Sequence, residues 1–252
     1  MTEQIKFQWL LRCADNALVL SQRLSEWCGK GPALEEDMAA TNVALDLIGQ
    51  ATLWFAYATE IDDAGRDADQ LAFLRDAHDF RNTLLVEQPN ADYGHTLMRQ
   101  FYFDVWHYFF LKALCHSTDA RVAGIAEKSV KEVSYHVRRS GDLIVRLGDG
   151  NEESRHRMQR SADALWMYTG ELFTADEIDT EMAKHGIAPD LAAMRASWLA
   201  HVTEIFAEAT LTLPPQDAWM QKGGKTGTHT EHLGYLLAEM QFLQRAYPGA
   251  QW

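Results

Sequence analysis

The sequence contains few cysteines, and their arrangement gives no disulfide framework. Only Cys13, Cys28 and Cys115 occur among 252 residues, and no two of them form a C-x-x-C pair. This excludes the paired pattern of a small, disulfide-rich secreted domain. Isolated thiols that act as small apolar side chains are typical of a reducing compartment. We therefore expect a cytoplasmic protein.

Positive charge and long apolar runs are also scarce. The chain has 23 Lys and Arg against 36 Asp and Glu, a net charge of −13, whereas nucleic-acid binding requires concentrated positive charge. The most apolar stretch, residues 106–115, contains His107 and Lys112 and is much shorter than the about 20 residues that cross a bilayer. The amino terminus lacks a basic segment followed by an apolar run, so no signal peptide is expected. We expect no nucleic-acid partner and no membrane association.

Apolar residues recur at helical spacing along most of the chain, without strand-like alternation and without an internal repeat. The pattern predicts four long core helices, at about residues 3–28, 33–60, 95–116 and 119–147. A long connection, residues 61–93, separates the second from the third and implies a crossover. A helical extension is predicted for residues 151–252. We predict one all-α domain over residues 1–252, a ferritin-like four-helix bundle with a long crossover and additional C-terminal helices.

Acids and imidazoles occupy the apolar faces of the third and fourth predicted helices. Asp104 and His107 share a stripe with Phe101 and Leu111, and His136 lies on the valine-rich face of the fourth helix, four residues after Glu132. A charge in an apolar core is costly unless it is paired, hydrogen-bonded or bound to a metal. The sequence therefore predicts a buried polar cluster in the bundle.

A working ferritin-like site holds two irons with one carboxylate from each of two helices and a Glu-x-x-His pair from each of the others. Here Asp46 is followed three residues later by Gly49, and Glu132 by Tyr135. These gaps favour a polar cluster satisfied by hydrogen bonds over a dinuclear metal site. The candidates for the degenerate site are Asp46, Asp104, His107, Glu132 and His136. A single metal ion on the last four remains open, because carboxylate and imidazole together suit several divalent ions.

Other motifs that could bear chemistry are weak. His229 and His232 form an H-x-x-H pattern near the carboxyl terminus, and such a pair is common without a metal. The preceding GGKTG loop lacks the phosphate-loop spacing, and no nucleophile elbow or dinucleotide fingerprint occurs. We therefore assign no catalytic, cofactor-binding or metal-binding residue to this chain.

Several long segments, in order, resemble one family. They are DNALVLSQRLSEWCG, NVALDLIGQA, LLVEQPNADY, KEVSYHVRRS, ELFTADEID and GTHTEHLGYLLAEMQFLQRAYPGAQW. The chain resembles the C subunits of bacterial phenylacetyl-CoA epoxidases over nearly its whole length. The resemblance implies a non-catalytic, structural subunit of a multicomponent monooxygenase that uses oxygen and NADPH to epoxidise the aromatic ring of phenylacetyl-CoA in phenylacetate degradation.

The resemblance also implies where the cofactors and partners lie. The di-iron centre is expected on the catalytic A subunit, and NADPH, flavin and iron–sulfur groups on partner subunits, with none on this chain. This chain would pair with the catalytic subunit and stabilise it, and further subunits would complete the complex. We hypothesise that the third helix, apolar on all sides, helps form that interface. The alternatives are a metal-binding ferritin-like oxygenase active in its own right and a self-assembling shell or carrier, since the isolated chain could self-associate.

Overall fold

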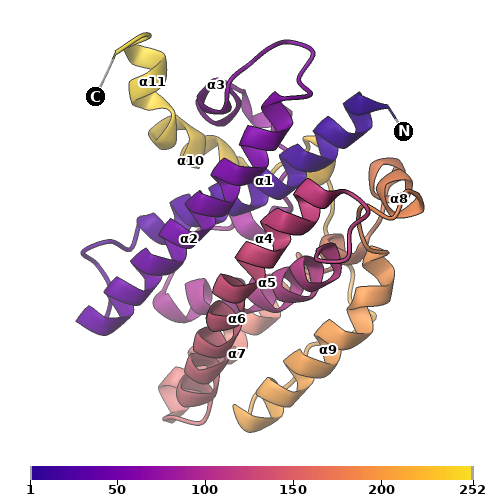
Figure 1. The fold of residues 1–252 in the computed structure, drawn as a ribbon. Helices are drawn as coiled ribbons and strands as arrows, with labels where there is room; N and C mark the ends of the chain where they lie inside the picture. The colour runs from indigo at the N-terminus through magenta and orange to yellow at the C-terminus, as the bar shows by residue number, and fades with distance from the viewer. Residues whose placement is uncertain (1, 251–252) are drawn as a thin grey trace. The chain divides into compact units, whose positions relative to one another are not determined.

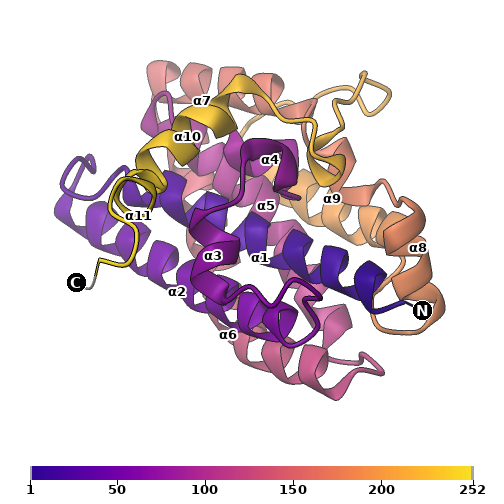
Figure 2. The ribbon, with the colours of Figure 1, turned by 90° about the horizontal axis from the view of Figure 1, so that it is seen from above.

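The computed structural model describes residues 2–250 and is all-α (Figures 1 and 2). The described chain forms eleven α-helices and three short 3₁₀ helices, and no strand occurs within residues 2–250. The prediction of an all-α protein is therefore confirmed. No helix in this part of the chain combines the length and apolarity that a membrane crossing needs.

The chain divides into two compact units. Unit one comprises Met1–Pro89 and Gly223–Trp252, and unit two comprises Asn90–Lys222. The carboxyl-terminal segment thus belongs with the amino-terminal helices, not with the helices that directly precede it. The prediction of a single domain over residues 1–252 remains a prediction.

Unit one is built on α1 (Glu3–Ser25) and α2 (Leu34–Thr59), which lie side by side and exchange many contacts (Figure 1). Trp9 and Trp54 meet edge to face between them, with ring centroids 6.1 Å apart. The smaller elements of the unit are α3 (Ala68–Phe73), α4 (Leu84–Glu87), α10 (Glu231–Met240), α11 (Phe242–Ala246) and the 3₁₀ helices Ala77–Asp79 and Gly224–Thr226. These short elements cover the polar side of α1, so that Arg12, Asp15, Asn16 and Arg23 are all buried.

Unit two is built around its central helix, α5 (Tyr93–Leu114). This helix packs against α6 (Ala120–Gly148), α7 (Glu152–Trp166) and α9 (Leu191–Glu208). The remaining elements are α8 (Glu177–Lys184) and the 3₁₀ helix Gly170–Phe173. Tyr102 lies at the aromatic centre, with its ring centroid 5.8 Å from those of both Trp166 and Trp198. At the end of α6, Gly148 allows a close approach, because a Cβ there would collide with the carbonyl oxygen of Ala209.

The four long helices lie where helical periodicity placed them, within three residues at each end. The hypothesis that the third helix helps form an interface with another subunit remains a prediction. Most of α5 is buried in this chain, and Lys112 is its one exposed residue. An apolar face open to solvent occurs on α2 instead.

Candidate functional site

The strongest candidate site lies between α5 and α6 in unit two. One face of α5 carries Gln100, Asp104 and His107, and α6 brings His136 and Ser140. All five side chains are buried. The Gln100 Nε2 donates to Asp104 Oδ1 at 2.6 Å, and Ser140 Oγ donates to the His136 carbonyl oxygen at 2.9 Å. We call these residues the α5–α6 polar cluster.

Burial dominates the protonation of the cluster. Desolvation raises the pKa of Asp104 from 3.8 to about 6, although nearby His136, Ser140 and Gln100 oppose the shift. Desolvation also lowers the pKa of His107 to about 3, and the charge of His136 acts in the same direction. His107 is therefore a neutral imidazole near pH 7, while Asp104 loses its proton slightly below neutral pH.

Three polar atoms that α5 contributes to the cluster are buried with no hydrogen-bond partner among the described residues. They are Asp104 Oδ2, His107 Nδ1 and Gln100 Oε1. A buried polar atom in this position is costly unless water or an ion satisfies it. The cluster is therefore a polar site among the buried apolar side chains of α5 and α6, such as Phe101 and Val133.

The structure brings together three of the five candidate residues. Asp104, His107 and His136 lie in the cluster, whereas Glu132 on α6 is half-buried. Asp46 on α2 is also half-buried and belongs to unit one. Within residues 2–250, no group of three or more His, Cys, Asp or Glu side chains is placed to hold a metal ion. The assignment of no metal to these residues remains a prediction.

The donor set does not fit a dinuclear iron centre. Gly49, three residues after Asp46, is exposed and has no side chain, and Tyr135, three residues after Glu132, is 44% exposed. Neither carboxylate is therefore followed by an imidazole at the spacing of the ferritin-like ligand pair. The cluster contributes one buried carboxylate and two imidazoles, which is too few donors to bridge two metal ions.

Replacing Asp104 by Asn is expected to stabilise the protein increasingly as the pH rises from about 4 to 6. The folded state raises the Asp104 pKa, so the wild type is most stable below the unfolded pKa of about 3.9, where Asp104 is protonated. The wild type then loses stability as the pH rises through about 6 and Asp104 becomes charged. The shift of about two units corresponds to about 2–3 kcal/mol. The asparagine side chain keeps an acceptor for Gln100 and carries no charge.

Urea unfolding of Asp104→Asn and of the wild type, compared between pH 4 and 7.5, measures this difference. Asp142→Asn, which removes an exposed carboxylate on α6, is the control and is expected to follow the wild type. Parallel pH profiles for Asp104→Asn and the wild type would contradict the proposed cost of the buried charge.

Unit one contains a second buried polar network, which sequence reasoning missed. The Glu87 side chain is fully buried and accepts from Asn82 Nδ2 at 2.9 Å, from the Thr230 backbone at 2.7 Å and from Thr230 Oγ1 at 2.8 Å. Its Oε2 also lies 2.7 Å from His229 Nδ1. The sequence pattern singled out His229 as part of an H-x-x-H pair, but its structural partner is a glutamate 142 positions earlier. No local spacing signals such a contact.

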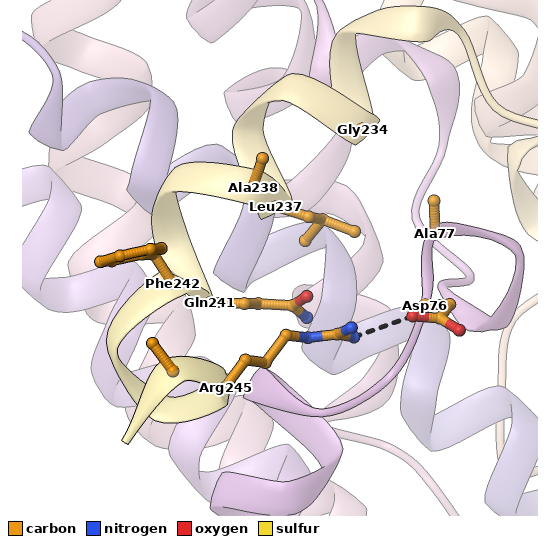
Figure 3. A pocket seen from close by; sticks show the side chains of 9 residues that line it. Asp76, Ala77, Gly234, Leu237, Ala238, Gln241, Phe242 and Arg245 are labelled. Carbon is orange, nitrogen blue, oxygen red and sulfur yellow. Dashed lines mark hydrogen bonds and ion pairs between the residues drawn. The ribbon is translucent and has the colours of Figure 1, made fainter. Parts of the chain in front are cut away.

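A groove of about 490 Å³ lies along α10 and α11 (Figure 3). Its wall includes Leu237, Phe242 and Arg245, and Asp76 faces Arg245 across it. The Arg245 Nη2 donates to Asp76 Oδ1 and to the Arg75 carbonyl oxygen, both at 2.9 Å. The guanidinium thus links α11 to the segment after α3, and the Asp76 carboxylate balances its charge.

The fold and the cluster define a class: an all-α, ferritin-like protein with a polar cluster between two long helices. A family model for the phenylacetic acid catabolic proteins matches residues 1–252, and the chain belongs to this family. It is similar to the C subunit of 1,2-phenylacetyl-CoA epoxidase from Escherichia coli (strain K12). The two are 49% identical over 244 residues, which cover 97% of this chain and 98% of the relative.

Proposed function

We propose that this chain is the non-catalytic, structural subunit of a multicomponent oxygenase that epoxidises the aromatic ring of phenylacetyl-CoA. It pairs with the di-iron catalytic subunit and stabilises it, in the cytoplasm. The observation that carries the proposal is the 49% identity to the C subunit of an epoxidase along nearly the full length of both chains. The incomplete ligand pairs at Asp46 and Glu132 support it, because this chain lacks the donors for the expected di-iron chemistry.

The cofactors of such an oxygenase would lie on its other subunits. Iron would be held by the catalytic subunit, and NADPH, flavin and iron–sulfur groups by the electron-transfer partners. This chain contributes a folded helical surface. The competing function, a metal-dependent oxygenase active without a partner, draws on Asp104 Oδ2 and His107 Nδ1, which are buried and have no hydrogen-bond partner in the described chain.

Co-production with the catalytic subunit tests the proposal. We expect that subunit to co-purify with this chain, and its soluble, active yield to fall when this chain is left out. Metal analysis of the isolated chain is expected to show iron and manganese far below stoichiometric amounts. A catalytic subunit that is equally soluble and active alone would contradict the structural role. Near-stoichiometric metal with oxygenase activity in the isolated chain would establish the competing function.

A further inference from the structure

The solvent face of α2 is apolar over five turns. Leu34, Met38 and Leu45 are 72%, 59% and 60% exposed. Thr41 lies between Met38 and Leu45, and Ile48 follows Leu45; both are half-buried. Thr52 ends the row and is exposed. We call Leu34, Met38, Thr41, Leu45, Ile48 and Thr52 the α2 stripe. Large aliphatic side chains aligned on one exposed face are typical of an interaction site, whereas isolated ones are not.

The spacing of the α2 stripe matches the seam of a coiled coil. Its members follow one another at intervals of four, three, four, three and four residues. This is the alternation that keeps apolar side chains facing a partner helix when two helices pack at a shallow, left-handed crossing angle. Such a seam accepts another long helix and suits neither a small ligand nor a loop.

The opposite face of α2 is already occupied. Val43, Leu47 and Trp54 on that face are buried, and the helix packs along α1. α2 is therefore apolar on two sides, a pattern found in helices that are covered all round. Within this chain Leu34, Met38 and Leu45 on the second side stay exposed, so this side is available to a partner.

Charge indicates the chemistry of that partner. α2 contains Glu35, Glu36, Asp37 and Asp46 and has no Lys, Arg or His between Leu34 and Thr59. Glu35 is exposed beside the stripe. A second copy of this chain would present the same acidic helix and another net charge of −13, so like charges would oppose that pairing. A complementary helix carries Lys or Arg beside its apolar seam.

We propose that the α2 stripe docks a helix of the catalytic subunit, one with an apolar seam flanked by basic residues. The inference rests on the proposed function and deepens it by placing the contact on α2. The stripe residues fit into the spaces between side chains of that helix, and Glu35 faces a basic side chain at the rim. The aliphatic contacts provide the affinity, and the charges provide orientation and partner choice.

Two stripe substitutions test the placement. Met38→Glu with Leu45→Glu puts acids at two exposed positions, so the fold should persist, which circular dichroism and thermal melting check. The matched control is Leu74→Glu with Tyr235→Glu, in the same unit and 50% and 68% exposed. Binding of the purified catalytic subunit is measured for both. We expect a loss of about tenfold or more for the stripe variant and wild-type binding for the control.

A labelling experiment avoids the effects of added charge. Leu45→Cys is prepared with the exposed Cys28 replaced by serine, and its reaction with a maleimide is timed. We expect the catalytic subunit to slow labelling at position 45. In the same assay, Glu35→Lys is expected to weaken binding, more strongly at low than at high salt.

The outcomes separate the two proposals. If the wild type binds the catalytic subunit while stripe variants bind equally well and the thiol introduced at position 45 stays reactive, the placement on α2 is wrong and the proposed function stands. If the wild type does not bind that subunit, the proposed function and the assigned occupant both fail. If the stripe substitutions instead dissociate a homo-oligomer of the isolated chain in sedimentation, the occupant is a second copy and the proposal is overturned.

Discussion

Replacing Asp15 by Asn is expected to lower the free energy of unfolding by about 3–5 kcal/mol, the range for breaking a buried ion pair. Asp15 is fully buried on α1, and Arg75 is 4% exposed. The Asp15 carboxylate accepts from both terminal nitrogens of Arg75, including Nη1 at 3.0 Å, and from the Arg81 backbone at 2.8 Å. Asparagine is neutral, so the buried guanidinium loses its counter-charge. Chemical unfolding at pH 7, followed by circular dichroism, measures the loss.

A double variant isolates the cause of that loss. Asp15→Leu combined with Arg75→Met removes both charges, and it should be more stable than Asp15→Asn because no buried charge is left unpaired. Glu153→Gln breaks the exposed pair with Arg157 and is expected to unfold as the wild type does. If Asp15→Asn stays within about 1 kcal/mol of the wild type, the pair does not stabilise the fold as argued.

Asp15 and its neighbour show why the connection after α2 could not be predicted in detail. Asn16 Oδ1 accepts from the Thr83 backbone and from Thr83 Oγ1, both at 2.9 Å. With the Arg75 pair, these bonds fix residues 75–83 onto α1. Helical periodicity predicted the helix itself, but it holds no information on which irregular segment covers the polar side of α1. Pairings across 60 or more residues depend on the folded path of the chain.

Helical periodicity could predict which residues of the candidate site lie on the apolar faces of their helices. Asp104, His107 and His136 fall on apolar stripes, and the structure buries all three. Glu132 lies at the edge of its stripe, four residues before His136, and helical spacing alone did not separate a half-buried edge position from a buried one.

The two apolar helices show a related limit. α5 and α2 are both apolar on more than one side, but α5 is mostly buried in this chain while α2 keeps an open face. A sequence pattern reports that a face is apolar. Which segment covers that face is settled by tertiary packing and assembly, so apolarity alone could not distinguish α5 from α2 as the helix with an open surface.

The second large effect is expected at the Glu87–His229 pair, where Glu87→Gln should lower the free energy of unfolding by about 3–5 kcal/mol. The carboxylate of Glu87 receives bonds from Asn82, His229 and both the backbone and hydroxyl of Thr230. In glutamine, one of the two acceptor oxygens becomes an NH₂ donor, which must then face other donors in a fully buried position. Because the network joins α4 to the segment before α10, we expect residues 223–250 to lose protection first, measured by hydrogen exchange.

His229 makes this contact sensitive to pH. Its Nδ1 lies 2.7 Å from Glu87 Oε2 and its Nε2 lies 3.1 Å from the Phe80 carbonyl oxygen, so both ring nitrogens face acceptors and both are satisfied only in the protonated imidazole. Burial lowers the pKa of His229, but the bond to Glu87 and its charge outweigh burial, and the net pKa is raised. The stabilisation is therefore fully present below the unfolded pKa of about 6.5 and is lost as the pH rises through the folded value.

The stabilisation from protonated His229 is present in the wild type at pH 6 and is lost in alkaline solution. His229→Gln should remove it. The two proteins should differ most at pH 6, and their melting temperatures should converge as the pH approaches 9. The control is His185→Gln, which removes the partly exposed imidazole beside Glu181 and should keep the wild-type pH profile. A difference between His229→Gln and the wild type that is constant from pH 6 to 9 would mean that His229 acts through packing and neutral hydrogen bonds. The contact between Glu87 and His229 would then stabilise the carboxyl-terminal segment independently of charge.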